Sequence, residues 1–353
     1  MKRRVTRQIS VGTVKVGGGA VISVQSMTNT DTRDPQSTIA QIRRLESVGC
    51  DLVRVAVPDM EAAEKLGEIK RDITIPLVAD IHFDYRLALR AVKGGVDGLR
   101  INPGNIGGKA KVRSVVEAVR ERQLPIRIGV NSGSIEKELL SKYGRPTPEA
   151  MVESALNHIK ILEALEFYDT KISLKASNVP DTIEAYRLIS EKVDYPLHLG
   201  ITEAGTSFAG AIKSSVGIGI LLNEGIGDTL RVSLTADPID EVRAGYEILK
   251  ALKLRERGVN IISCPTCGRC EIDLIHLANE IEARLAHITH PIDVAIMGCV
   301  VNGPGEAKEA DIGIAGGRGT GLLFKKGKAM RKIKEKELAD VFIEEVEMMA
   351  ENL

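Results

Sequence analysis

The chain has 353 residues, of which 43% are hydrophobic and 3% are aromatic, and its 48 basic residues balance 48 acidic ones. A net charge of zero argues against a nucleic-acid-binding protein, because that class usually carries a basic excess. The sequence has no apolar run of about 20 residues that would suggest a membrane span and no apolar core of a secretory signal. We therefore expect a cytoplasmic protein with two domains, 1–257 and 258–353.

Short apolar runs alternate with helical patterns in the first domain. Several runs are almost continuously apolar, which is typical of strands buried on both faces of a parallel sheet. Ser37–Val48 has a helical apolar stripe, and Thr147 followed by Pro148 marks the start of another helix. Eight such repeats predict an α/β protein with a (β/α)8 TIM barrel, and an open doubly wound sheet is the alternative. The eight runs are Val21–Met27, Leu52–Val57, Leu77–Ile81, Gly98–Ile101, Ile126–Val130, Lys171–Leu174, Leu197–Ile201 and Leu230–Leu234.

The regular alternation of apolar runs and helical patterns ends after residue 257, where the sequence predicts a small α/β domain. We expect three strands, Gly258–Ser263, Ile292–Met297 and Asp311–Ala315, and two helices, Ile272–Ala286 and Glu337–Glu351. Three further segments are interpreted as irregular. Residues 131–148 are predicted to form an extended loop at the top of the barrel, Gly313–Gly321 a turn or lid, and Lys325–Lys336 a solvated turn and helix start.

Cations lie in or beside five of the eight apolar runs, although a charge in a buried strand is costly unless it meets a partner charge. Active sites of (β/α)8 barrels form at the carboxyl ends of the strands, and arginine binds phosphate oxygens through paired hydrogen bonds. We therefore predict a small-molecule polyanionic substrate, with a diphosphate as the simplest case; pairing with barrel carboxylates is the alternative. The predicted anion-binding residues are Arg54, Arg100, Asn102, Arg127, Asn131, Lys175, Ser177, Arg231 and Ser233.

Acidic and imidazole side chains also follow the predicted strands. Asp80 and His82 come after the third strand, and His198 and Glu203 lie around the seventh. Such groups orient hydroxyls or move protons, or they hold other site residues by hydrogen bonds. Both interpretations stay open for His82 and His198, whereas the position of Glu203 on a turn just past a strand favours a functional role.

Four of the five cysteines lie in the last quarter of the chain. Cys264, Cys267 and Cys270 follow a C-x-x-C-x-x-C spacing, and Cys299 comes 29 residues later. Thiolate sets of this kind hold structural zinc or an iron–sulfur cluster, and free buried thiols are a third possibility. A reducing cytosol disfavours a disulfide framework.

A glycine-rich turn follows Cys299 and offers one more ligand. The turn at 303–305 could fold Glu306 back towards Cys299. A carboxylate oxygen on a cluster iron would be weak and replaceable, and would leave that iron able to bind substrate as a Lewis acid. The spacing alone does not choose between Cys270 and Glu306 as the fourth ligand.

Six short segments, spread in order over nearly the whole chain, carry a distinctive pattern. They are Val24–Thr28, Asp80–Asp84, Leu99–Asn105, Ile201–Gly205, Ser263–Arg269 and Gly298–Glu306. Together they resemble the 4-hydroxy-3-methylbut-2-enyl diphosphate synthases, in the bacterial two-domain form without the middle domain of plant-type relatives. The last two segments are the most specific.

The resemblance implies an activity and a cofactor. The expected reaction opens 2-C-methyl-D-erythritol 2,4-cyclodiphosphate reductively to 4-hydroxy-3-methylbut-2-enyl diphosphate, in the non-mevalonate isoprenoid pathway. The family uses a [4Fe–4S] cluster and electrons from ferredoxin or flavodoxin. By motif match the cluster ligands are Cys264, Cys267, Cys299 and Glu306, with Cys270 outside the set.

The resemblance also implies residue roles and an assembly. Glu203 and His82 would position or protonate a leaving oxygen, and Glu306 would yield its iron to a substrate oxygen. The family is a homodimer in which the cluster domain of one subunit caps the barrel of the other. Two other classes of protein remain as alternatives. One is a zinc-stabilised barrel lyase or synthase that acts on a phosphorylated substrate without redox chemistry, and the other is a non-catalytic, metal-stabilised module that binds RNA or a protein.

Overall fold

The computed structural model describes residues 2–299 and 308–352. The chain forms two compact units that divide between Arg255 and Glu256. The first contains the long alternation of strands and helices, and the second contains the clustered cysteines. No helix within the described residues is long and apolar enough to cross a membrane.

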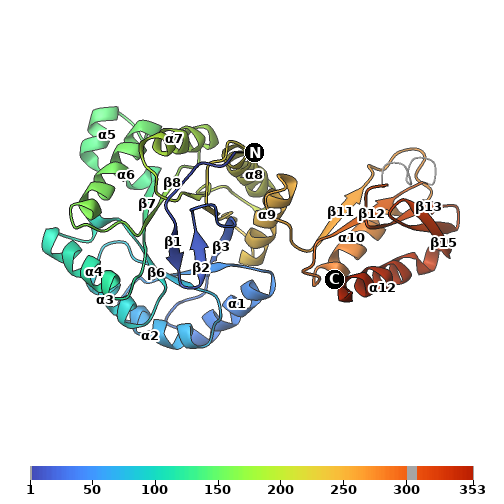
Figure 1. Ribbon diagram of the computed structural model, residues 1–353, viewed down its shortest axis with the longest axis horizontal. Coiled ribbons are helices and arrows are strands. Elements are labelled where there is room, and N and C mark those ends of the chain that lie inside the picture. The colour runs from blue at the N-terminus through green and yellow to red at the C-terminus, as the bar shows by residue number, and fades with distance from the viewer. Residues whose placement is uncertain (1, 300–307, 353) are drawn as a thin grey trace. The chain divides into compact units, whose positions relative to one another are not determined.

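The first unit is a (β/α)8 barrel, which confirms the predicted fold (Figure 1). Eight parallel strands pair in the order β8-β7-β6-β5-β4-β3-β10-β9, and a parallel bridge between Ile172 and Leu197 joins the two ends of this order. Chain order around the barrel is what repeated right-handed β/α crossovers produce. The strands are β3 Ser23–Met27, β4 Leu52–Ala56, β5 Leu77–Asp80, β6 Gly98–Ile101, β7 Ile126–Asn131, β8 Thr170–Lys175, β9 His198–Leu199 and β10 Thr229–Leu230.

Helices form a ring outside these strands (Figure 1). The predicted cap at Thr147 is present, because its side chain accepts a hydrogen bond from the backbone N–H of Ala150 at 3.2 Å. The helices are α1 Pro35–Ser47, α2 Met60–Arg71, α3 Tyr85–Lys93, α4 Lys109–Glu121, α5 Lys137–Tyr143, α6 Pro148–Glu163, α7 Val179–Lys192, α8 Ser207–Asn223 and α9 Pro238–Ala251, with short 3-10 turns η1 Pro103–Asn105 and η2 Ser132–Ser134.

The prediction of an extended loop over residues 131–148 is wrong, because η2 and α5 lie within it. Leu139 of α5 is buried in the main core, and Gly144 ends the helix with a left-handed φ of 75°. Gly144 therefore marks the end of a short helix, and Pro148 is the first residue of the next one.

Alternate residues of each barrel strand serve different purposes. Val53 and Val55 belong to the apolar core beneath the helices, whereas Arg54 between them lines a polar cavity. Because side chains alternate across a strand, the outward positions stabilise the barrel and the inward positions are free to carry polar groups.

A short hairpin that the sequence analysis did not foresee packs against the amino-terminal part of the barrel. Strands β1 Ile9–Val11 and β2 Val14–Val16 pair antiparallel. Their Val11 and Val16 pack with Leu52 and Val78, near the beginnings of β4 and β5, in a separate apolar cluster. The hairpin thus provides an apolar floor on the side opposite to the carboxyl ends of the strands.

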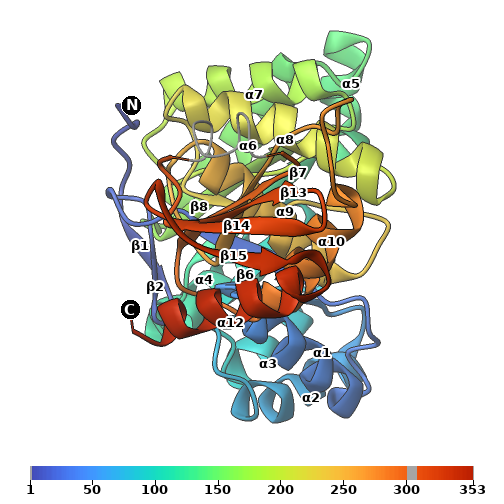
Figure 2. The ribbon, with the colours of Figure 1, turned by 90° about the vertical axis from the view of Figure 1, so that its right-hand side faces the viewer.

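The second unit is a five-stranded sheet with two main helices, as the predicted α/β domain requires (Figure 2). The strands lie in sequence order, with β11, β12 and β13 parallel and β14 and β15 antiparallel. Both helices pack on the same core cluster as Val294 and Ile314. The elements are β11 Val259–Ser263, α10 Leu274–Leu285, β12 Ile292–Met297, β13 Ile312–Gly317, β14 Thr320–Lys325, β15 Lys328–Lys334, η3 Glu335–Glu337 and α12 Leu338–Glu351.

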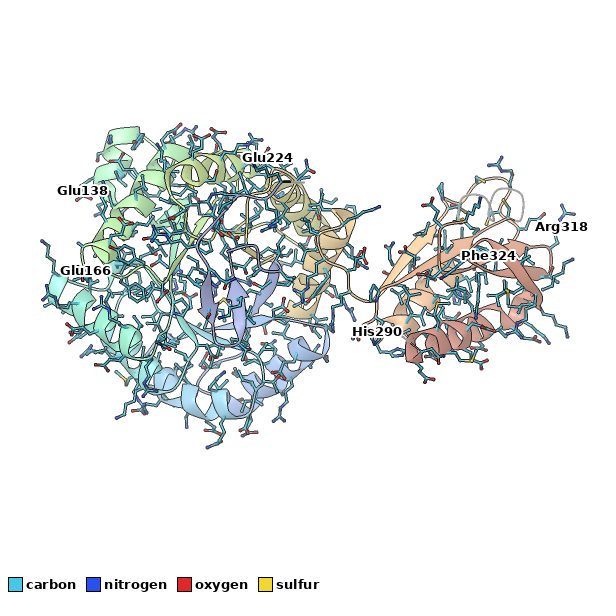
Figure 3. The ribbon with its side chains drawn as sticks, in the orientation of Figure 1. Glu138, Glu166, Glu224, His290, Arg318 and Phe324 are labelled. Carbon is cyan, nitrogen blue, oxygen red and sulfur yellow. The ribbon has the colours of Figure 1, made fainter. Side chains whose placement is uncertain are left out.

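Two predictions for this unit are wrong. Gly313–Gly321 lies mainly in β13 and β14, where Gly313 leaves room for the buried ring of Phe324 (Figure 3). The basic run Lys325–Lys336 contains the edge strand β15 rather than a turn and helix start. Its single buried residue, Ile333, anchors a strand that is otherwise exposed, and lysines are common on edge strands because they oppose pairing with another chain.

Candidate active site

The interior of the barrel contains a charged layer. Asp80, Arg100, Arg127 and Lys171 are register partners on the neighbouring strands β5, β6, β7 and β8. The first three line a cavity of about 180 Å³. Layers inside such barrels are usually filled by branched apolar side chains, so a charged layer indicates a binding site rather than a simple core.

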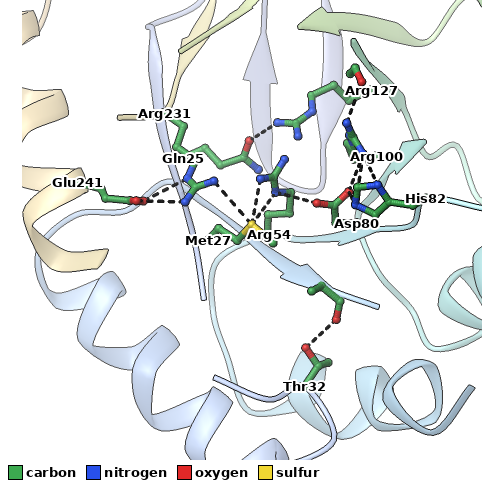
Figure 4. A network of polar contacts seen from close by, with 12 residues as sticks. Gln25, Met27, Thr32, Arg54, Asp80, His82, Arg100, Arg127, Arg231 and Glu241 are labelled. Carbon is green, nitrogen blue, oxygen red and sulfur yellow. Dashed lines mark hydrogen bonds and ion pairs between the residues drawn. The ribbon is translucent and has the colours of Figure 1, made fainter. Parts of the chain in front are cut away.

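Asp80 is the centre of one polar network (Figure 4). Its carboxylate pairs with Arg100 at 3.3 Å and with Arg54 at 3.5 Å. Arg100 also donates from Nη2 to the carbonyl oxygen of Gly129 at 2.7 Å. A Cβ at position 129 would lie 2.5 Å from Nε of Arg100, so glycine is needed there for the guanidinium to keep its place.

A second carboxylate enters the barrel from helix α9 (Figure 4). Glu241 pairs with Arg231 at 3.1 Å and also accepts hydrogen bonds from the hydroxyl of Ser26 and the backbone N–H of Leu234, each at 3.0 Å. Its oxygens are therefore already engaged. Arg127 has a neutral partner instead, donating from Nη1 to Oε1 of Gln25 at 2.9 Å.

The site holds more cations than carboxylates. Arg127, Lys171 and Lys175 have no carboxylate at ion-pair distance within the described residues. The Nζ atom of Lys171 is buried and lacks any hydrogen-bond partner there. Asp80 and Glu241 thus face a larger set of cations, namely Arg54, Arg100, Arg127, Lys171, Lys175 and Arg231.

Burial and mutual repulsion change how these groups titrate. Burial, followed by repulsion from Arg127 and Arg54, lowers the pKa of Lys171 to about 7. Burial also lowers the pKa of Arg54 to about 10 and that of Lys175 well below its usual range. Burial alone would raise the pKa of Asp80, but Arg54, His82 and Arg100 outweigh it and hold that pKa well below its ordinary value. The site therefore favours an added negative charge.

A second cavity of about 230 Å³ lies beside the first and shares His82, Arg100, Asn131 and Thr202 with it. The first is called the inner cavity below, and the second the outer cavity. Its other polar side chains are amides, hydroxyls and one carboxylate: Asn102, Asn105, Ser132, Ser134 and Glu203. Such groups exchange hydrogen bonds with the hydroxyls of a ligand. Glu203 has a left-handed φ of 52°, a costly conformation for a non-glycine residue that occurs often at functional sites.

In the second unit the thiols gather at the carboxyl ends of two parallel strands. Cys264 directly follows β11, and Cys299 lies two residues after β12, which pairs with β11. Sγ of Cys264 accepts a hydrogen bond from the N–H of Gly298 at 3.3 Å. Sγ of Cys270 lies so close to Gly298 that a Cβ there would be 2.6 Å away.

This donor set suits a thiolate-bound metal centre in its chemistry. Within the described residues, however, no three donor side chains converge on one point, and Cys267 is exposed. A backbone hydrogen bond from Arg269 lowers the pKa of the Cys267 thiol. Glu306, the proposed oxygen ligand, lies outside the described residues.

Two family models match the chain almost from end to end. The GcpE TIM-barrel domain matches residues 6–246, and the GcpE protein C-terminal domain matches residues 260–348. The chain belongs to the GcpE family.

Curated relatives of this GcpE chain have a common name. The protein from Geobacter sulfurreducens is 66% identical over 342 residues, covers 97% of each chain, and is named 4-hydroxy-3-methylbut-2-en-1-yl diphosphate synthase (flavodoxin). The protein of the same name from Caldanaerobacter subterraneus is 62% identical over 347 residues and covers 98% of each chain. The family resemblance predicted from the six short segments is confirmed.

Solved structures resemble the GcpE barrel in fold alone. Dihydropteroate synthase from Yersinia pestis aligns with a TM-score of 0.50 at 14% identity, over 70% of this chain and 98% of that one. N-acetylneuraminic acid synthetase from Leptospira borgpetersenii aligns with a TM-score of 0.50 at 11% identity, over 71% of this chain and 92% of that one.

The GcpE barrel brings most of the predicted anion-binding residues together. Asn102 lines the outer cavity, whereas Ser177 is exposed and lines neither cavity. His82 lines both cavities, and His198 is fully buried beside Thr229 and lines neither. The predicted residues that line the inner cavity are Arg54, Arg100, Arg127, Asn131, Lys175, Arg231 and Ser233.

Several inward-facing residues of the same barrel were not predicted from the sequence. Lys171 and Ser173 precede Lys175 at intervals of two, so strand alternation places all three on one face. That periodicity was available in the sequence and would have added Lys171 and Ser173, whereas Ser177 fits the same interval but lies beyond the end of β8 at Lys175. Gln25 and Glu241 had no comparable pattern, because their roles depend on side chains of distant strands.

Replacing Lys171 with methionine should stabilise the ligand-free protein by ~3 kcal/mol at pH 7. The unfolded chain keeps this lysine protonated up to about pH 10.4, whereas burial lowers its pKa to about 7 in the folded barrel. The penalty on the parent is therefore full below about pH 7 and falls as the pH rises towards about 10.4, so the advantage of the variant should shrink over that range. Urea unfolding from about pH 6 to about pH 9 measures the difference.

The matched control is Lys160→Met on the exposed face of α6, where the change should be within about 0.5 kcal/mol. A Lys171→Met protein that is less stable than the parent over the whole pH range would show that the amine has a stabilising partner.

Proposed function

We propose that this chain catalyses the reductive ring opening and dehydration of 2-C-methyl-D-erythritol 2,4-cyclodiphosphate to 4-hydroxy-3-methylbut-2-enyl diphosphate. The reaction consumes electrons and protons and releases water, and it belongs to the non-mevalonate route to isoprenoids. The shared name of the relatives supports this activity. The observation on the chain itself that carries it is the set of uncompensated cations inside the barrel.

The inner cavity would hold the diphosphate. Arg127 and Lys175 have no carboxylate partner in the part of the chain that the structure describes, so phosphate oxygens would supply the missing negative charge. When the ring C–O bond breaks, charge develops on the freed diphosphate oxygen. Fixed cations in a site shielded from water stabilise such charge more than they stabilise the bound substrate, which lowers the barrier. The full proposed substrate-binding set is Arg54, Arg100, Asn102, Arg127, Asn131, Lys175, Ser177, Arg231 and Ser233; Asn102 lines only the outer cavity, and Ser177 is the least supported because it is exposed.

The outer cavity would hold the carbon skeleton and its hydroxyls. Glu203 and His82 line this cavity, which would also hold the hydroxyl that leaves as water. We assign them to positioning that hydroxyl or delivering its proton. The contact of His82 with Asp80 at 3.5 Å and with Arg100 supports a fixed ring orientation.

The second domain, residues 258–353, would hold a [4Fe–4S] cluster through Cys264, Cys267, Cys299 and Glu306. When bound, such a cluster supplies the electrons that the ring opening needs. The chain contributes the thiolates, and the crowding of Cys270 against Gly298 keeps a further thiol close by. A cytoplasmic location would keep these thiols reduced.

The electron donor would be ferredoxin or flavodoxin, and the names of the relatives include flavodoxin. Strand β15 presents the exposed cations Lys328, Arg331, Lys332 and Lys334. A positive patch raises the rate of encounter with a carrier that has an acidic surface.

Turnover tests the proposed function directly. Anaerobically purified, cluster-loaded protein with reduced flavodoxin should convert the cyclic diphosphate into the linear product, which phosphorus NMR distinguishes. Arg127→Met should weaken the binding of inorganic diphosphate by roughly tenfold or more, because a charge-assisted contact is lost. The matched variant Arg113→Met, on the exposed side of α4, should bind as the parent does. Full cluster absorbance without any conversion would refute the activity.

Cysteine variants separate the proposed ligands from their neighbours. Cys264→Ser should abolish the absorbance of the cluster near about 400 nm, because a thiolate ligand is lost. Cys50→Ser, in the buried core of the barrel, should keep it. Cys270→Ser should retain both the cluster and turnover if Glu306 is the fourth ligand, and loss of the cluster in that variant would identify Cys270 as the ligand instead. The spectrum of each anaerobic protein and its iron content measure the outcome.

The active form is proposed to be a homodimer. Helix α8 supports this, because Phe208, Ile212, Val216 and Ile220 are 80%, 49%, 48% and 38% exposed and recur every four residues along one stripe. A contiguous exposed apolar stripe typically marks a protein–protein interface, and a stripe that is its own complement suits a two-fold dimer.

Ile212→Glu should shift the protein from dimer to monomer by at least about tenfold in dissociation constant, because a charge is then buried in an apolar contact. Sedimentation velocity over a concentration series measures the change. Ile275→Glu on α10, a still more exposed isoleucine in the second unit, should leave the dimer intact. Unchanged sedimentation of Ile212→Glu would exclude α8 from the interface.

A further inference from the structure

His158 lies on α6, behind the active site, and contacts two separate loops. Its Nδ1 accepts a hydrogen bond from the backbone N–H of Gly104 at 3.1 Å, and its Nε2 lies 3.2 Å from Oε1 of Glu136. The ring is 3% exposed. A histidine buried this deeply is normally either a packing residue or a fixed element of a polar network, and both of its nitrogens are engaged here.

These contacts determine the state of the ring. Nδ1 faces a donor, so it carries no proton, and the proton of the neutral ring is therefore on Nε2, the nitrogen that lies next to the carboxylate of Glu136. A doubly protonated ring would point an N–H at the N–H of Gly104 and break that contact. Burial is the main reason why the pKa of His158 is lowered, with attraction by Glu136 opposing and repulsion by Arg100 assisting.

The two loops are those that build the outer cavity. Gly104 belongs to η1, between Asn102 and Asn105, and both of these asparagines line the cavity. Glu136 follows the segment 131–134, which lines the same cavity from the end of β7. We propose that His158 is a positioning residue that ties these loops together and so fixes the amides that hold the carbon skeleton of the substrate.

Two details distinguish this arrangement from ordinary core packing. A Cβ at position 104 would lie 2.8 Å from Cε1 of His158, so the loop comes to the ring as closely as a glycine allows. Oε2 of Glu136 is buried without a partner in the described part of the chain. An otherwise unsatisfied carboxylate directed at one imidazole is costly, and a purely structural contact has no need of it.

The inference rests on the proposed function and predicts a selective defect. His158→Leu removes both contacts and should weaken the binding of the cyclic substrate by about tenfold or more, because small misplacements of positioning groups have large effects. Inorganic diphosphate should bind within about threefold of the parent, because most of the residues lining its cavity do not belong to these loops. Calorimetric titration of the oxidised, cluster-loaded protein with each ligand measures both without turnover.

Conservative variants keep the test valid if His158→Leu does not fold. His158→Asn retains an acceptor for Gly104 and should recover part of the affinity, whereas His276→Asn, an exposed histidine on α10, should have no effect. The parent should also lose affinity for the substrate in acid, at a pH below the ordinary histidine value of about 6.5 because burial lowers the pKa of His158, relative to His158→Asn, which cannot titrate. Glu136 and Arg100 are the charged groups that act on this ring, and both are the same in the two proteins.

The outcomes separate the two levels of the proposal. Equal binding of the cyclic substrate by parent and folded His158→Leu, or equal losses for both ligands, would overturn the positioning role and leave the proposed function intact. A parent that binds neither ligand would overturn both.

Discussion

The structure depends on one electrostatic constraint: cations are buried inside the barrel without enough carboxylates to balance them. Desolvating a charge costs several kcal/mol unless a partner compensates it, and Asp80 and Glu241 are already shared among Arg54, Arg100 and Arg231. Among the described residues, Arg127, Lys171 and Lys175 have no carboxylate at ion-pair distance, and an anionic ligand would supply the missing charge. Because the β1–β2 hairpin packs an apolar floor against the beginnings of the strands, that ligand reaches the cations from the carboxyl ends.

The same constraint explains how the chain divides its chemistry. The two family models fall on separate parts of the chain; Cys50 is buried in the core of the barrel, whereas the four clustered thiols lie on the second part. There, two parallel strands end side by side and bring Cys264 and Cys299 to one edge of the sheet. The cations and the clustered thiols thus lie in different units, the cations in the cavity of the barrel and the thiols at the ends of β11 and β12.

Three glycines matter to the proposed sites because they have no side chain. Gly129 leaves space for the guanidinium of Arg100, Gly104 lets a loop reach the ring of His158, and Gly298 lies directly against Cys270. None of the three has a left-handed φ. Close approach, rather than backbone flexibility, therefore accounts for glycine at each position, and each lies next to a residue that binds, positions or flanks the chemistry.

The sequence by itself determined the eight strand–helix repeats, the family and most of the inward cations, because apolar runs, caps and short motifs are local patterns. It also predicted the thiol spacing, although no pattern could select Glu306 or Cys270. Only the tertiary structure decided that Arg127 meets Gln25, that Glu241 reaches Arg231 from a helix, and that His158 joins two loops. These partners lie on different elements of the barrel, so their pairing follows from strand register and helix packing, which a linear pattern does not encode. Ser177 continues the alternation of β8 but lies past its last residue, Lys175, and is exposed, while the basic run Lys325–Lys336 was interpreted by residue type although it contains β15.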